Sequence, residues 1–178
     1  MLFSGLEYGQ FTLVDQKADR AVSAVGDMVS QYAAMRSEDM KDIFIAASNI
    51  LEHYQFTGSG ILIVSHIHAP PAGIPKITWQ TASSSSMAVS SKLGHAGATP
   101  PLPAGFAMDA GATVVAVETF IKLEPILFNP AVKAREVYKI SWHHPRRAEQ
   151  IAYTNTADPS IDSKSHGNTK SGKRAVFA

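Results

Sequence analysis

The chain of 178 residues contains no cysteine. A disulfide scaffold, a thiolate metal site and a cysteine nucleophile are therefore all excluded. An excess of charge of one sign is also lacking, because 16 Lys and Arg are balanced by 15 Asp and Glu. This balance gives no overall attraction to nucleic acid or to anionic lipid.

Long hydrophobic runs are lacking as well. No window approaches the roughly 18–20 continuous apolar residues that a membrane-spanning helix requires. Residues 1–6 have neither the basic region nor the apolar run of a signal peptide. The apolar content of 45% is nevertheless enough to form the core of one domain.

The N-terminal part of the chain predicts two helices. In residues 6–35 apolar side chains recur at spacings of three and four, with charged residues on the other face. Gly26 weakens this helix by about 1 kcal/mol relative to Ala, although a glycine also permits close packing. Ser37 predicts the N-cap of a second helix, whose apolar stripe continues to Tyr54 and stops before Gly58. The short connection between the two helices favours an αα-hairpin or an L-shaped pair.

The pattern then changes to β-branched and apolar runs that are typical of strands. The expected strands are residues 61–68, 76–81, 113–123 and 133–144. In the third of them Val115, Val117, Ile121 and Leu123 share one face. Because the helices precede the strands, we expect an α+β fold in which both helices pack on an antiparallel sheet of about four strands.

This reading divides the chain into three parts. Residues 1–35 form a stem helix, and residues 36–147 form the globular α+β domain. That domain includes a flexible loop at residues 82–110, which is rich in Ser, Gly, Ala and Pro. Residues 148–178 form a disordered polar and basic tail, because they cannot bury enough apolar area to become ordered.

Two histidines are the strongest candidates for a binding site. His66 and His68 are two residues apart in a predicted strand, so both imidazoles share a face and could meet one metal ion. His143 and His144 could add a further ligand. No carboxylate flanks the first pair, however, so we expect histidines on a solvated strand face and neither a metal nor a cofactor.

No catalytic pattern is present. Residues 57–60 lack the Gly-x-Ser-x-Gly nucleophile motif, and there is neither a P-loop nor a dinucleotide fingerprint. Glu118 and Glu124 share a strand face but lie far apart, so we expect surface charges. The tail has basic residues without interleaved aromatic ones, which does not favour nucleic-acid binding. These basic residues are Lys164, Lys170, Lys173 and Arg174.

Three segments carry a family resemblance. Residues 3–10 read Phe-Ser-Gly-Leu-Glu-Tyr-Gly-Gln and lead into the amphipathic residues 17–32. Ile-Thr-Trp-Gln at residues 77–80 is followed by a loose loop with Leu-Pro-Ala-Gly. Residues 114–125, a strand and a corner, precede a closing segment, residues 133–147, that ends in His-Pro-Arg-Arg.

Together these segments resemble the TadE-like family of tight-adherence (Tad/Flp) pilus assembly proteins over about residues 3–147. Residues 3–10 are similar to the end of that family's membrane helix. The apolar part of the helix is absent here, and Gln10 replaces a frequent basic residue. The resemblance implies a natural chain that extends upstream through an inner-membrane helix.

The resemblance also implies a function. A TadE-like protein would be a membrane-anchored minor pilin or pseudopilin without catalysis, on the periplasmic side of the inner membrane or at the cell surface. Its partners would be other pilins or pilus assembly proteins. The alternative is a soluble ligand- or metal-binding module that uses the strand face of His66 and His68.

The expected interaction surface lies on the stem helix. The second helix and the sheet are expected to cover this helix only from about Ala18 onward. Large apolar side chains before that point would stay in water, and such a cluster favours association. These residues are Phe3, Leu6, Tyr8, Phe11 and Leu13.

Overall fold

The computed structural model describes residues 2–51, 60–83, 87–123 and 135–155, with backbone alone for residues 2–8 and 10. Helices come first and a four-stranded antiparallel sheet follows, which confirms the predicted α+β fold. The elements are α1 (Leu2–Ser30), β1 (Ala34–Arg36), α2 (Ser37–Leu51), β2 (Gly60–His68), β3 (Lys76–Ala82), β4 (Thr113–Leu123), β5 (Arg135–His143) and β6 (Ala152–Thr154). Among the described helices, none is long and apolar enough to cross a membrane.

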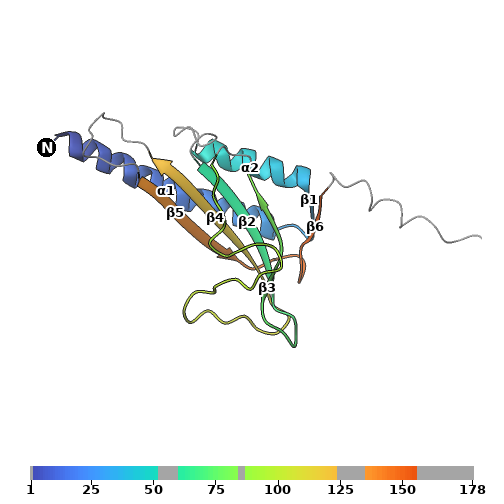
Figure 1. The fold of residues 1–178 in the computed structure, drawn as a ribbon. Coiled ribbons are helices and arrows are strands. Elements are labelled where there is room, and N and C mark those ends of the chain that lie inside the picture. The colour runs from blue at the N-terminus through green and yellow to red at the C-terminus, as the bar shows by residue number, and fades with distance from the viewer. Residues whose placement is uncertain (1, 52–59, 84–86, 124–134, 156–178) are drawn as a thin grey trace, which may run out of the picture.

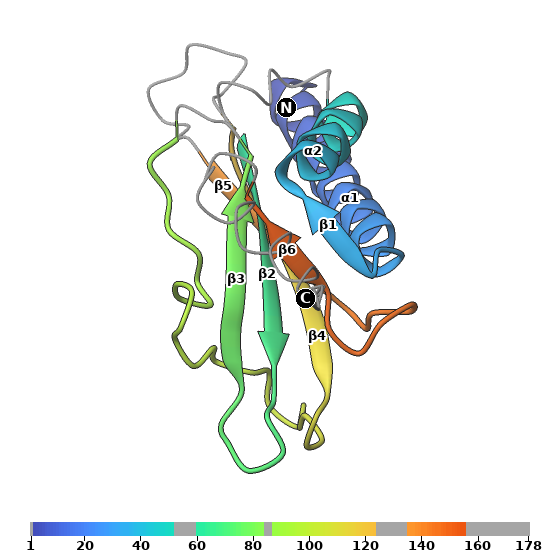
Figure 2. The same ribbon diagram turned by 90° about the vertical axis from the view of Figure 1, so that its right-hand side faces the viewer.

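The main sheet has the strand order β3-β2-β4-β5, and both helices lie on one of its faces (Figures 1 and 2). Strands β2 and β4 occupy the centre and are buried along almost their whole length. On the helix side, Val115, Val117, Ile121 and Leu123 belong to the main core, as their shared face predicts. The predicted bounds of β4 are also confirmed.

Helix α1 is continuous and buries one apolar stripe against β4, β5 and α2. The stripe follows the spacing of three and four residues that the sequence predicts. Its fully buried members are Val14, Ala18, Ala21, Val22, Val25 and Val29.

The helix ends at Ser30, five residues earlier than expected. The amides of Gln31 and Tyr32 bond to carbonyls three residues back, which tightens the last turn. The Ser30 carbonyl accepts a hydrogen bond from the Arg146 amide at 2.8 Å. The chain therefore leaves the helix and enters β1, a strand that the predicted αα-hairpin did not include.

Helix α2 begins at Ser37, where the sequence predicts a helix start. The Arg36 amide donates to Oδ2 of Asp39 at 2.8 Å, which satisfies a backbone donor at this end. Glu38 and Asp39 complement the positive end of the helix dipole. The expected continuation to Tyr54 lies outside the described residues.

The second face of the sheet is covered by residues 87–110. Leu93 is buried there against Ile67 and Ile77, and the ring of Phe106 lies 5.6 Å from that of Trp142. The amide of Ile77 bonds to the carbonyl of Ala98 at 3.0 Å. This part of the predicted flexible loop is thus packed on the sheet, which explains why β2 and β4 are buried on both faces.

The predicted boundary of the globular domain at residue 147 is too early. Ile151 is 1% exposed and belongs to the main core. Strand β6 pairs in parallel with β1, and the two form a small second sheet beside the helices (Figure 2). The rest of the predicted tail, residues 156–178 with all four of its basic side chains, lies outside the described residues.

Candidate functional site

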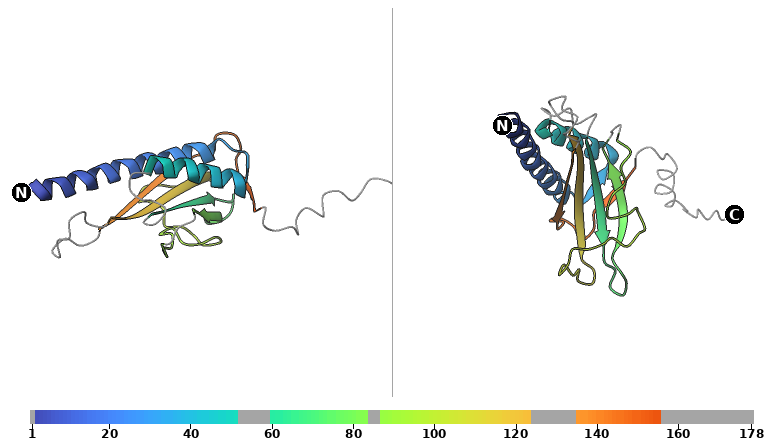
Figure 3. Two further views of the ribbon diagram at one scale, coloured as in Figure 1. Left: turned by 90° about the horizontal axis from the view of Figure 1, so that it is seen from above. Right: turned by 60° about the vertical axis from the view of Figure 1, so that its left-hand side comes forward.

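The N-terminal part of α1 extends past the ends of β4 and β5 (Figures 1 and 3). Among the residues of α1 whose side chains are described, Val14 is the first that is fully buried. Immediately before it, Leu13 is 54% exposed, and Gly9 is exposed with nothing near the position of a Cβ atom. Leu13 is therefore a large apolar side chain in water at the root of the projecting segment.

Phe11 differs from the expectation that it is uncovered. Its ring is partly buried and packs against the main core, and the Arg135 guanidinium lies 5.6 Å from the ring centroid. The sheet therefore covers α1 from about two turns before Ala18. The side chains of the other three proposed contact residues, Phe3, Leu6 and Tyr8, are outside the description.

His66 is 1% exposed, which corrects the expectation of a solvated histidine. Its Nδ1 lies 2.6 Å from Oγ1 of Thr78, whose hydroxyl donates to the His66 carbonyl. The hydroxyl oxygen must therefore accept a hydrogen bond from Nδ1, so Nδ1 carries the ring proton. The other nitrogen, Nε2, accepts the amide of Ile151 at 3.1 Å. The ring is thus a neutral Nδ1–H tautomer with both nitrogens engaged.

His68 lies on the same side of β2 and is half-buried. Its Nδ1 is 3.1 Å from Oγ1 of Thr113, and its Nε2 is 3.2 Å from Nε2 of Gln150. The strand thus places His66 and His68 on one face, yet His66 has no lone pair left for a metal ion. Within the described ranges, no group of three or more His, Asp or Glu side chains could hold one.

A stack of rings continues from His66. Its ring lies 5.2 Å from that of Trp79, nearly parallel at 12°, and Trp79 stacks in turn on Tyr153 of β6 at 4.9 Å. Trp79 Nε1 donates to the carbonyl of Ile151 at 2.8 Å. The side chains of His66 and Trp79 therefore bind the backbone N–H and the backbone carbonyl of Ile151, respectively. Burial, and to a smaller extent the charge of His68, lowers the pKa of His66 to about 4.

A bulge in the sheet makes this arrangement possible. His66 pairs with Trp79 and Ile67 with Ile77, so Thr78 has no partner in β2. The extra residue turns Ile77 to the outer face and Trp79 to the helix face. Sequence reasoning singled out His66 but missed both Trp79 and Ile151.

Glu118 is fully buried, which corrects the expectation of a surface charge. Its carboxylate accepts hydrogen bonds from the Ser91 hydroxyl, from the Lys92 amide at 3.0 Å and from the Tyr138 hydroxyl at 3.0 Å. Burial, together with the charge of Glu118 and this hydrogen bond, raises the pKa of Tyr138 well above its usual range. The Lys92 ammonium lies 3.6 Å from the centre of the Tyr138 ring. This cluster attaches the covering loop to β4 and β5. Glu124 lies outside the described residues.

A third cluster contains Asp27, Ser141 and His143 where α1 meets β5. His143 Nδ1 is 3.7 Å from Oδ1 of Asp27, and Nε2 is 3.2 Å from Oγ of Ser141. The Ser141 hydroxyl, however, donates its hydrogen to the Val22 carbonyl at 2.9 Å. His143 therefore does not take a proton from Ser141, and the three residues do not form an activated nucleophile. The pKa of His143 lies below its ordinary value. Burial and the charge of Arg146 lower this pKa, and the charge of Asp27 raises it by less.

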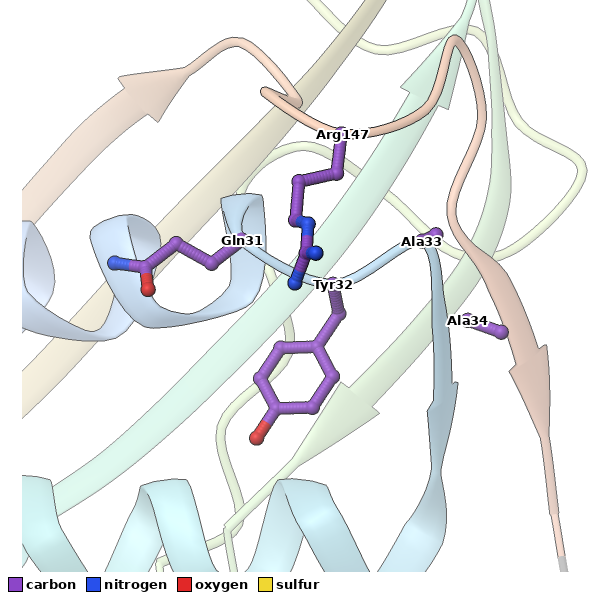
Figure 4. Close-up of a pocket in the computed structure, with 5 residues that line it drawn as sticks. All are labelled: Gln31, Tyr32, Ala33, Ala34 and Arg147. Atoms are coloured by element: carbon purple, nitrogen blue, oxygen red, sulfur yellow. The ribbon is translucent and has the colours of Figure 1, made fainter.

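An open depression of about 730 Å³ lies where α1 leads into β1 (Figure 4). Figure 4 shows the Arg147 side chain lying across the loop between Gln31 and Tyr32, while the Tyr32 ring points away from it. Among the described lining residues only Arg147 brings a charge, so they offer no pair of acid and base groups. The remaining lining residues are Ala33 and Ala34.

Comparison with protein-family models, with curated proteins and with solved structures finds no match. The candidate surfaces therefore rest on the geometry given above.

Proposed function

We propose that the chain is a non-enzymatic component of a Tad/Flp-type pilus assembly, similar to TadE-like minor pilins, and that it acts through α1. The observation that carries the proposal is the projection of this helix beyond the sheet (Figure 3). From Val14 onward the buried stripe of the helix packs against β4, β5 and α2, which holds it in place. The part before Val14 is thus presented on a rigid support, as a helix that binds neighbouring pilins would be.

Leu13 marks the surface that this function would use. It is 54% exposed, and burying a Leu side chain is worth about 1.5–3 kcal/mol. The sequence places three further large apolar residues, Phe3, Leu6 and Tyr8, in the same segment. Other pilins or pilus assembly proteins, on the periplasmic side of the inner membrane or at the cell surface, are the partners that fit this proposal.

The experiment is analytical ultracentrifugation, combined with vesicle flotation, of the full chain and of substituted variants. Deleting residues 1–14 would remove the buried Val14 and disturb the core, so polar substitutions make a sharper test. We expect Leu6→Ser combined with Leu13→Ser to reduce self-association or membrane binding while the circular dichroism spectrum stays unchanged.

The matched control is Ile45→Ser on α2, because Ile45 is 60% exposed but lies away from the projecting segment. We expect this variant to associate as the unsubstituted chain does. A full chain that remains monomeric and ignores vesicles, or equal losses in both variants, would remove the physical support for the proposal.

A further inference from the structure

The attachment of β6 to the main sheet depends on one neutral histidine. Strand β6 has three residues and pairs only with β1 among the described strands. Ile151 precedes it, and its amide and carbonyl are bound by His66 and Trp79. Tyr153 adds the stacking contact with Trp79. His66 and Trp79 therefore connect the C-terminal end of the described chain to β2 and β3.

We propose that His66 is a pH-sensitive latch, whose protonation releases Ile151 and β6 from the main sheet. In the neutral ring Nε2 is an acceptor for the Ile151 amide. A proton on Nε2 turns this atom into a donor that faces another donor, so the hydrogen bond is lost. The charge would also be buried at a position that no carboxylate of the described residues faces, which is costly.

Among the described residues, no carboxylate faces the ring of His66. On β2 the nearest titratable group is His68, which opposes protonation. On β6 it is Tyr153, on the far side of Trp79. In β5, His143 shares a cross-strand row with His66 through Val115, and it is faced by Asp27 of α1. In the connection that precedes Ile151, Arg147 and Glu149 are exposed.

The direction of the pH effect follows from the lowered pKa. The pKa of His66 is about 4 in the folded protein, against an ordinary value of 6.5. The attached state therefore binds fewer protons than the released state between these values. The stability that the neutral ring gives to attachment is therefore fully present above pH 6.5 and is lost as the pH falls toward 4.

Release would also change the surface beside α2. Tyr153 and Asn155 form one wall of an apolar groove of about 580 Å³, which Met40 and Phe44 line from the other side. When β6 moves away from the main sheet, this groove opens toward Trp79. Acid would thus expose an apolar surface beside α2.

Amide hydrogen exchange and ¹⁵N NMR of the full chain test the latch. We expect the protection of the Ile151 amide, corrected for intrinsic exchange, to fall by up to about tenfold per pH unit between pH 6.5 and 4. Amides in the centre of β4 should keep their protection. The imidazole nitrogen shifts of His66 should show the Nδ1–H tautomer at neutral pH.

His66→Gln supplies a side chain that does not titrate in this range, and His68→Gln is the matched control. We expect the first to abolish the pH dependence at Ile151 and the second to retain it. If His66→Gln fails to fold, the measurements on the unsubstituted chain still decide. An Nε2–H tautomer, a pH-independent Ile151 amide, or the same pH profile in His66→Gln would overturn the proposal.

Discussion

Gly26 of α1 lies so close to His143 of β5 that a Cβ atom on it would be 2.7 Å from Cγ of the imidazole and closer still to Cδ2 and Nε2. The glycine is therefore a point of contact between helix and sheet. The sequence predicted that a glycine here could permit close packing. The structure identifies the group that packs against it.

Gly26→Ala is expected to destabilise the fold. Overpacking costs about 1–3 kcal/mol, and the higher helix propensity of Ala returns about 1 kcal/mol, so a net loss of up to about 2 kcal/mol should appear in urea unfolding. Gly9→Ala is the matched control, because nothing lies within 4 Å of its Cβ position. It should be neutral or stabilising. Equal effects of both substitutions would show that His143 does not constrain α1.

Glu118→Gln is expected to lower the free energy of unfolding by about 1–3 kcal/mol. The NH₂ group of the Gln side chain would face a donor, either the Tyr138 hydroxyl or the Lys92 backbone amide, in a buried site. Glu136→Gln, at an exposed position of β5, should change it little. Urea titration of both variants makes the comparison. A Glu118 variant as stable as the Glu136 variant would contradict the assigned hydrogen bonds.

Periodicity predicted the elements whose partners are close in sequence or whose faces are strongly apolar. Helix α1 and strand β4 are examples, since both carry a long run with one clear spacing. The burial of Glu118 could also have been expected. Strand β4 is apolar on both faces, Val115 and Val117 on one and Val114 and Ala116 on the other, so a charge within it had to be enclosed.

The strands β1 and β6 could not be predicted in this way. Each has three residues, too few to show alternation, and their parallel pairing joins Ala34 to Ala152 from opposite ends of the chain. The site around His66 depends on this pairing and on the bulge at Thr78. Neither has a local signal, so sequence reasoning found the histidine without its partners.

Lys139→Met is expected to lower the stability of the fold only slightly. The ammonium bonds to Asp15 at 2.9 Å and to Asp19 at 3.1 Å, and the first of these hydrogen bonds raises its pKa. Both carboxylates are substantially exposed, so the pair should contribute less than about 1 kcal/mol, and salt should reduce that contribution. Thermal unfolding at low and high salt checks this. A large loss that does not depend on salt would point to lost packing of the Lys139 stem.

Tyr138 should make the fold sensitive to alkali. Its pKa is raised by burial, by the charge of Glu118 and by their hydrogen bond, so the folded protein keeps the phenolic proton above the ordinary pKa of 10. The unfolded chain releases it. The stability that Tyr138 contributes is therefore present below pH 10 and is lost as the pH rises, by up to about 1.4 kcal/mol per pH unit.

Phenolate absorbance and unfolding free energy, measured together against pH, test this expectation. Of the five tyrosines, we expect Tyr138 to ionise only as the protein unfolds. Tyr138→Phe should cost about 1 kcal/mol at neutral pH through the lost hydrogen bond, but it should remove this tyrosine's share of the alkaline decline. Tyr153→Phe is the control, because it leaves the hydrogen bonds to Glu118 intact and should keep that decline. Ionisation of all five phenols in the folded protein near pH 10, or an unchanged decline in Tyr138→Phe, would show that Glu118 and Tyr138 are not joined as described.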